Sequence, residues 1–152
     1  RVVFGTSSSP FLAQFVLQQH AEKNKDPYPL AADTIENATY MDDSMDSAVD
    51  DQQAIELYRQ LKELYGKADM YPHKWLSNSR NVLEQIPPEE RASKVQLENN
   101  QLPSIKTLGL QWSAEEDVFT FTSFLLKETQ LTKRTLLKRI ASLFDPVALL
   151  TS

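Results

Sequence analysis

Residues 34–48 read TIENATYMDDSMDSA, a segment with little helical periodicity. Its first half suits a β-strand, its middle a tight turn and its end a second strand. The residues concerned are Ile35, Asn37, Thr39 and Tyr40 for the first strand, Met41-Asp42-Asp43 for the turn and Ser44-Met45 for the second strand. The pattern predicts a β-hairpin within residues 35–48, with the Asp42–Asp43 pair at or beside its turn.

Helices are predicted on both sides of this hairpin. Apolar side chains three and four residues apart predict an amphipathic helix over residues 10–23, with a serine capping its start. A second stripe predicts a helix that begins at Asp50 or Asp51 and ends at a left-handed Gly66. The two stripes comprise Phe11, Leu12, Phe15 and Val16, and Ala54, Ile55, Tyr58, Leu61, Leu64 and Tyr65. Glu56 and Arg59 are expected to form an ion pair on the wet face of the second helix.

The remaining segments alternate between strand and loop patterns. Residues 70–77 are predicted to form a short edge strand interrupted by Pro72, and residues 79–92 a loop. Residues 105–122 are predicted to form a hairpin with its turn at 113–117, and Thr132 is expected to cap a last helix through Leu143. Together these elements predict an α+β fold.

Composition is that of a globular chain, with 152 residues, 41% hydrophobic and 24% charged. It excludes a wholly disordered tail, a collagen-like rod and a membrane protein, because no apolar run approaches the roughly 20 residues that cross a bilayer. Cysteine is absent, which excludes disulfides, thiolate zinc sites and a cysteine nucleophile. The chain opens on Arg1 and a strand-like segment and closes on an apolar run, so we expect a fragment of a longer protein.

Acidic residues are concentrated in one segment. Between Asp33 and Glu56 there are eight acids and no Lys or Arg, and the rest of the chain carries 16 basic and 13 acidic residues. The net charge of −5 therefore combines a mildly basic body with one acidic insert. Much of this insert can be explained as a solvated loop followed by the first turn of a helix. This interpretation explains Asp42 and Asp43 less well.

Two adjacent carboxylates at a turn repel each other, which raises the pKa of one unless a cation lies between them. Mg²⁺ prefers such oxygen ligands and completes its shell with water and phosphate oxygens. Two such ions about 4 Å apart can activate a 3′-hydroxyl and stabilise a leaving pyrophosphate. An ordinary acidic turn is the alternative interpretation of the Asp42–Asp43 pair.

Five segments, in order along nearly the whole chain, resemble one family. Tyr40-Met41-Asp42-Asp43 resembles the catalytic turn of reverse transcriptases, and Thr107–Trp112 resembles their primer-grip hairpin. The segment from Phe4-Gly5 to Ser9-Pro10 resembles the start of the polymerase helix beneath the incoming nucleotide and template. Pro72–Ser79 and residues 132–146 resemble segments of the BEL/Pao group of LTR retrotransposons, although Ala148 stands where that group usually has glycine.

The resemblance implies a polymerase palm-like antiparallel sheet backed by two helices, a second hairpin and a C-terminal thumb-like helix, truncated at both ends. Residues 1–124 would be a partial palm that includes the primer-grip-like hairpin, and residues 125–152 the start of the thumb or connection. The implied activity is that of an RNA-directed DNA polymerase, using two Mg²⁺ ions (or Mn²⁺) and deoxynucleoside triphosphates. The implied partners are an RNA or DNA template with a DNA primer and the rest of the polyprotein, in the cytoplasm or a retroelement particle, without a membrane.

The resemblance also assigns roles to individual residues. Asp42 and Asp43 would hold the catalytic metals, and Lys74 would place a cation near the pyrophosphate unless it is simply a solvated strand lysine. Nucleotide binding is implied for Phe4, Gly5, Ser9, Pro10, Tyr40 and Met41, and primer binding for Leu108, Gly109 and Leu110. Lys133, Arg134, Lys138 and Arg139 would face duplex phosphates or form a solvated helix face.

The family needs a third metal-binding Asp upstream of residue 1, so the chain alone is expected to have little or no polymerase activity. A decayed or co-opted element copy, acting as a non-catalytic binding or interaction domain, is one alternative. An unrelated α+β domain with a fortuitous acidic turn is another. A structure without a hairpin at 35–48 packed on two helices would favour the latter.

Overall fold

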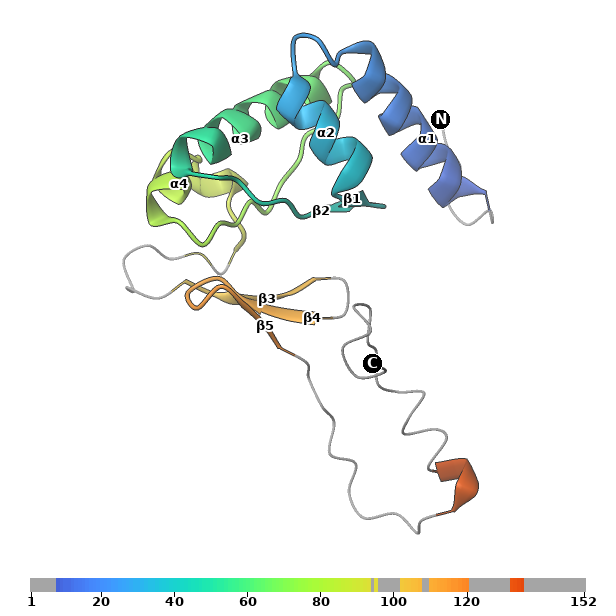
Figure 1. The fold of residues 1–152 in the computed structure, drawn as a ribbon, viewed down its shortest axis with the longest axis vertical. Coiled ribbons are helices and arrows are strands. Elements are labelled where there is room, and N and C mark those ends of the chain that lie inside the picture. Colours follow the sequence, from blue (N-terminus) through green and yellow to red (C-terminus); the bar gives the residue numbers. More distant parts are fainter. Residues whose placement is uncertain (1–7, 94, 96–101, 108–109, 121–131, 136–152) are drawn as a thin grey trace. The chain divides into compact units, whose positions relative to one another are not determined.

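The computed structural model describes residues 8–93, 95, 102–107, 110–120 and 132–135. In these ranges the fold is α+β, with five helices, one of them a 3₁₀ helix, and two small antiparallel sheets (Figure 1). This confirms the predicted α+β class, whereas the palm-like arrangement that the resemblance implies stays a prediction. The chain forms two compact units, Arg1–Asn99 and Asn100–Ser152. The boundary expected between residues 124 and 125 lies outside the described residues and stays a prediction.

Helix α1 spans Ser9–Lys23, close to the predicted range, with Pro10 in its first turn. The predicted serine cap is absent, because the side chain of the N-cap residue, Ser8, makes no capping hydrogen bond. The helix contacts α3 through His20, whose Nε2 lies 2.8 Å from the carbonyl oxygen of Leu64. This bond gives His20 a structural role that its place on the sequence pattern did not indicate.

Helix α2 spans Pro29–Asn37 and was not predicted. Ile35 and Asn37, expected in a strand, lie in this helix. Its start has no local side-chain cap; instead Gln60 Oε1 accepts hydrogen bonds from the backbone N–H groups of Leu30 (3.0 Å) and Ala31 (3.4 Å). Because the capping group comes from 30 residues away, the sequence before α2 offers no capping side chain, and Pro29 in the first turn is the local start signal that it does offer.

Helix α3 spans Asp51–Gly66, as predicted. Asp50 is its N-cap, and its Oδ1 accepts a hydrogen bond from Gln53 N–H at 2.8 Å. The prediction of a left-handed Gly66 is wrong: Gly66 is the last helical residue, and the following positive φ belongs to Asp69, at 55°. The predicted ion pair is also wrong, because Glu56 Oε1 accepts a hydrogen bond from Gln60 Nε2 and is not paired with Arg59.

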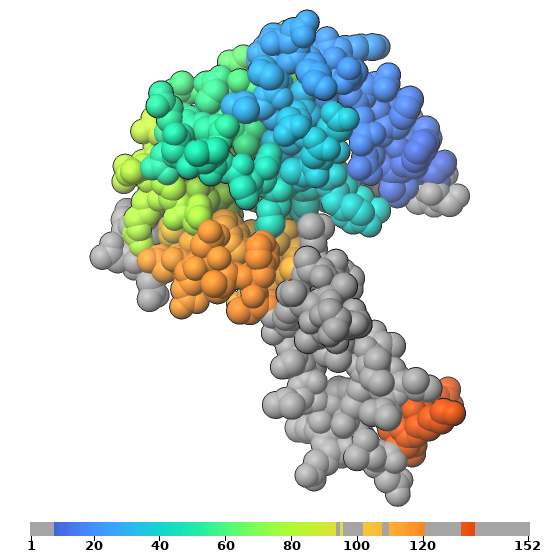
Figure 2. Space-filling model, viewed as in Figure 1, coloured from blue at the N-terminus to red at the C-terminus, as the bar shows by residue number. Residues whose placement is uncertain are grey.

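The core of the first unit lies where α1, α2 and α3 meet. It consists of Leu17, Ala21, Ala31, Ala32, Ile35, Leu61 and Leu64. The apolar stripe that predicted α1 is not part of it: Phe11, Leu12, Phe15 and Val16 remain 43–70% exposed. Helix α1 forms one flank of the first unit and packs on α2 through Leu17 and Ala21, near its C-terminal end (Figures 1 and 2).

Residues 79–92 contain helices where a loop was predicted. Helix α4 (Arg80–Glu84) packs against α3, and the 3₁₀ helix η1 spans Pro88–Glu90. Val82, Leu83 and Ile86 are buried, three and four residues apart, so a helical pattern was present in this short polar segment. The strand predicted at 70–77 is reduced to one parallel bridge between Trp75 and Arg91.

In the second unit, β3 (Ser104–Thr107), β4 (Leu110–Ser113) and β5 (Val118–Thr120) form an antiparallel sheet in the order β3-β4-β5. The segment predicted as one strand, residues 105–112, therefore contains parts of two paired strands, β3 and β4, whereas the predicted turn is confirmed between Ser113 and Val118. Thr132 Oγ1 accepts a hydrogen bond from Thr135 N–H at 3.1 Å, as a capping residue does. The rest of the predicted last helix lies outside the described residues.

The longest described helices, α1 and α3, have 15 and 16 residues. No helix in the described part of the chain combines the length and the apolar character needed to cross a membrane.

Candidate functional site

The Asp42–Asp43 pair lies at the end of a very short hairpin. Strand β1 (Thr39–Tyr40) pairs with β2 (Asp43–Ser44), with Thr39 opposite Ser44 and Tyr40 opposite Asp43. Met41 and Asp42 therefore form a two-residue loop. The predicted hairpin is confirmed, although it is shorter than residues 35–48 because α2 takes up the first part of that range.

The backbone at Met41 is unusual for its residue type. Its φ is 54°, in the left-handed region that non-glycine residues rarely adopt. Two-residue hairpin loops need a positive φ to match the twist of the strands, and glycine or asparagine usually supplies it. A methionine in this position carries a strain of order 1 kcal/mol, which the surrounding contacts must offset.

Both α2 and α3 support the hairpin. Thr39 Oγ1 donates to the carbonyl oxygen of Thr34 at 3.0 Å and lies 2.8 Å from Ser44 Oγ, which ties the two strands to α2. Tyr65 of α3 is partly buried beside them. Burial raises the pKa of Tyr65, while its hydrogen bonds with Ser44 and Thr39 act in the opposite direction. The hairpin is thus held on two helices, and the condition that would have favoured a fortuitous acidic turn is not met.

Six of the eight acids between Asp33 and Glu56 have polar partners. Asp33 accepts from Asn37, Asp46 from Thr34, Asp50 from Gln53, Asp51 from Asn81 and Glu56 from Gln60, while Glu36 lies 3.9 Å from Lys25 Nζ. Hydrogen bonds from Ser79 and Asn81 lower the pKa of Asp51. Asp42 and Asp43 differ: both are exposed, and their carboxylates have no hydrogen-bond or ion-pair partner among the described residues.

Two exposed neighbouring carboxylates fit the preferences of Mg²⁺, which binds one or two protein carboxylates and keeps other positions for water and phosphate oxygens. Within the described ranges no group of three His, Asp or Glu side chains converges. The residues present therefore fit part of a metal site, with Asp42 and Asp43 as its ligands and further ligands supplied from elsewhere.

The structure describes some of the other predicted site residues and not the rest. Tyr40 and Met41 flank the acids and are 59% and 49% exposed. Ser9 and Pro10 form the first turn of α1, and Leu110 is buried at the start of β4. Phe4, Gly5, Leu108 and Gly109 lie outside the described residues, as do Lys138 and Arg139, whereas Lys133 and Arg134 begin the short helical turn after Thr132.

Lys74 lies in the first unit, like the hairpin. It is exposed and has a φ of 62°, so the backbone turns sharply there. No hydrogen bond or ion pair in the described part of the chain joins it to Asp42 or Asp43. The role implied for Lys74 beside the pyrophosphate therefore stays a prediction.

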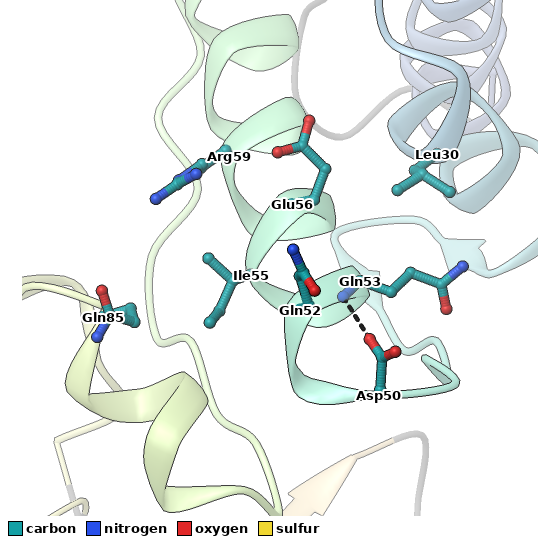
Figure 3. A pocket seen from close by; sticks show the side chains of 8 residues that line it. All are labelled: Leu30, Asp50, Gln52, Gln53, Ile55, Glu56, Arg59 and Gln85. Atoms are coloured by element: carbon teal, nitrogen blue, oxygen red, sulfur yellow. Dashed lines mark hydrogen bonds between the residues drawn. The ribbon is translucent and has the colours of Figure 1, made fainter.

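A shallow hollow of about 580 Å³ lies on α3, away from the hairpin acids. It is lined by Leu30, Asp50, Gln52, Gln53, Ile55, Glu56, Arg59 and Gln85 (Figure 3). The carboxylate of Asp50 is directed to the backbone of Gln53. The residues that line the hollow come from α2, α3 and the residue after α4, so no local sequence pattern could have revealed the hollow.

Comparisons with known proteins give no relative for this site. No family model matches the chain, and neither the curated proteins nor the solved structures contain a match. The chemistry of the hairpin rests on its own residues.

Proposed function

We propose that the chain is the rear part of a reverse transcriptase: most of a palm with a primer-grip-like hairpin and the start of a thumb, from a BEL/Pao-like retroelement polyprotein. The reaction is template-directed transfer of a nucleotide to a DNA primer 3′ end. One observation carries the proposal. In a segment where the other acids have structural partners, Asp42 and Asp43 present two exposed carboxylates that no other described residue pairs with, on a hairpin supported by α2 and α3.

Under this proposal the residues take the roles that the resemblance implies. Asp42 and Asp43 hold the divalent ions, with Asp42 the favoured direct ligand. The ions, when bound, lower the energy of the charge that develops on the attacking 3′-oxygen and the leaving pyrophosphate. Tyr40 and Met41 border the primer terminus, and the left-handed Met41 fixes the direction in which Asp42 leaves the loop. Lys74 provides a cation for the pyrophosphate.

Metal binding by the chain itself is the direct test. We expect Mg²⁺, and paramagnetic Mn²⁺ at lower concentration, to perturb the NMR signals of residues 40–44 first. Asp42→Asn should weaken this binding at least about tenfold, because one charged ligand is lost. Asp26→Asn, which removes the same charge from an exposed turn, is the matched control. Equal loss in both variants, or binding centred elsewhere, would contradict the site.

Polymerase activity requires a longer chain. We expect no primer extension on primed RNA by these residues alone, since they supply two of the three carboxylates that the resemblance implies. Efficient incorporation of deoxynucleotides by this chain alone would contradict that expectation. A chain lengthened by its natural upstream sequence should extend the primer. Asp42→Asn should then reduce the rate on the order of 100- to 1,000-fold, the scale of losing one preorganised electrostatic contact, while Asp26→Asn should not.

A non-catalytic interaction domain is the second candidate. The exposed stripe on α1, where the Phe11 and Phe15 rings stack with centroids 6.1 Å apart, favours it because large exposed apolar patches often mark interfaces. The upstream genomic sequence separates the two candidates. An open reading frame with a third Asp supports the polymerase, and a stop codon supports a co-opted relic.

A further inference from the structure

A polar cluster on α3 links that helix to the segment that carries Lys74. Tyr58 OH donates to Glu90 Oε2 at 2.6 Å, and Lys62 Nζ donates to Glu90 Oε1 at 2.5 Å. Lys62 Nζ also lies 3.3 Å from Tyr58 OH. The Lys62 bond, followed by the Tyr58 bond, lowers the pKa of the Glu90 carboxyl. These three residues, Tyr58, Lys62 and Glu90, are called the clasp below.

The main chain of Glu90 extends the clasp to Trp75. Trp75 N–H donates to the carbonyl oxygen of Glu90, and Ala92 N–H donates to the carbonyl oxygen of Trp75, both at 2.9 Å. The indole ring meets the Tyr58 ring edge-on, with centroids 4.9 Å apart. Trp75 is therefore held on both sides, by the backbone of residues 90–92 and by an aromatic ring of α3.

Lys74 directly precedes this anchored residue. Its left-handed φ of 62° is costly for a lysine and persists only where neighbouring contacts hold the backbone. The residue that follows it, Trp75, has such contacts with Glu90, Ala92 and Tyr58. Helix α3 thus holds the Lys74 segment through Tyr58 and Lys62 and holds the catalytic hairpin through Tyr65, so one rigid helix supports both candidate parts of the site.

We propose that Glu90 is a positioning residue, which through the clasp and Trp75 fixes Lys74 relative to the Asp42–Asp43 hairpin. The inference rests on the proposed function, because it assumes that Lys74 meets the pyrophosphate end of a nucleotide. Glu90 itself touches no substrate. It acts by limiting the conformations of the lysine, so the loss of Glu90 should weaken a Lys74 contact without removing any charge from Lys74.

Amide hydrogen exchange tests the clasp without reference to function. Glu90→Gln should lower the protection of the Trp75 and Ala92 amides about tenfold, the effect of losing a charge-assisted hydrogen bond on local opening. The amides of Ala32 and Ala38, which are bonded within the α2 region, should keep their protection. Glu89→Gln is the matched control, and Tyr58→Phe removes one clasp bond but keeps the ring against Trp75. Unchanged Trp75 protection in both clasp variants would overturn the proposal, as would an equal fall at every amide.

A second measurement tests the link to Lys74. The lysines are ¹³C-dimethylated, the Lys74 signal is assigned with Lys74→Arg, and inorganic pyrophosphate is added with Mg²⁺ or without it. We expect the Lys74 signal to shift with Mg²⁺ and pyrophosphate, and Glu90→Gln to raise the half-saturating concentration at least about threefold, because a smaller fraction of molecules is competent to bind. An equal response in Glu90→Gln and the parent chain would overturn positioning. A parent chain in which Lys74 never responds, although the exchange result holds, would instead refute the role of Lys74 in the proposed function.

Discussion

The hairpin loop and the start of α3 belong to one acidic run of the sequence, but their carboxylates have different surroundings. At the start of α3, Asp50 caps the helix and Asp51 accepts a hydrogen bond from Asn81, so both charges are used in holding the fold. At the hairpin, Asp42 in the loop and Asp43 at the start of β2 are exposed, and neither carboxylate has a hydrogen-bond or ion-pair partner among the described residues. A dense run of acids can thus combine groups that stabilise the chain with groups that remain available to a ligand.

The largest expected effect is at Asp46, which follows the hairpin. Thr34 is buried, and its Oγ1 donates to Asp46 Oδ2 at 2.5 Å. Asp46→Ala leaves that hydroxyl unpaired, so we expect the free energy of unfolding to fall by about 1–3 kcal/mol. Urea denaturation measures the change. If Asp46→Ala and Asp42→Ala were equally stable, the distinction between the two sets of acids would fail.

Asp50 should show a smaller loss. Asp50→Ala removes the bond to Gln53 N–H, and we expect about 1 kcal/mol of destabilisation, as for other N-cap residues. Asp50→Ser keeps an acceptor at the cap and should recover most of the loss. Thermal unfolding followed by circular dichroism can compare the two variants, and failure of serine to recover stability would argue against capping as the cause.

Met41 gives a prediction for the backbone of the hairpin. Glycine adopts a positive φ without strain, so Met41→Gly should change stability by no more than about 1 kcal/mol, the relief of strain being opposed by the greater flexibility of glycine in the unfolded chain. Met45→Gly, next to the hairpin, is the comparison. A larger loss for Met41→Gly than for Met45→Gly would show that the Met41 side chain supports the fold.

The smallest expected effect on stability is that of Asp42. Asp42→Ala should change the free energy of unfolding by less than about 0.5 kcal/mol, as for other exposed substitutions, although it should weaken Mg²⁺ binding. Chemical denaturation with and without Mg²⁺ measures both properties on one sample. A large loss of stability without metal would place Asp42 among the structural acids.

Acid titration also tests whether the acids at the start of α3 stabilise the fold. Asp51 has a pKa lowered from 3.8 in the folded chain, so its contribution to stability is present above that value and is lost as the pH falls through the lower folded value. Asp51→Asn should therefore flatten the pH dependence of unfolding below pH 3.8. An unchanged pH profile would show that the Ser79 and Asn81 bonds do not persist in solution.

Local patterns predicted the elements whose signals lie within them. Helix α3 has its cap and its stripe in one stretch, and the loop at Asp42 follows directly from its own residues. Helix α2 escaped prediction because Gln60 caps it from a distance, and α4 because it has only five residues, of which two, Val82 and Leu83, are buried. The exposed apolar stripe on α1 is the opposite case. The spacing of its apolar residues predicted a helix with an apolar face, but it did not predict whether another element covers that face.

The candidate site divides in the same way. The adjacent acids could be found from the sequence, but whether a described residue pairs with their carboxylates depends on the three-dimensional arrangement of their neighbours. The clasp joins Tyr58 and Lys62 to Glu90, and Tyr58 also meets Trp75; these residues are too dispersed for any motif. Long-range hydrogen bonds of this kind follow from packing and leave no trace in local periodicity.

The packing order of the first unit has a kinetic consequence. Helix α1 packs on α2, α2 on α3 and α3 on α4, and the hairpin contacts the helix that immediately precedes it. Apart from the bond between His20 of α1 and Leu64 of α3, these contacts join helices that follow one another in the chain, so little chain entropy is lost before they form. Chains with such local topology fold within microseconds to milliseconds. We therefore expect the support for the Asp42–Asp43 hairpin to assemble early, within the time that a ribosome needs to add a single residue.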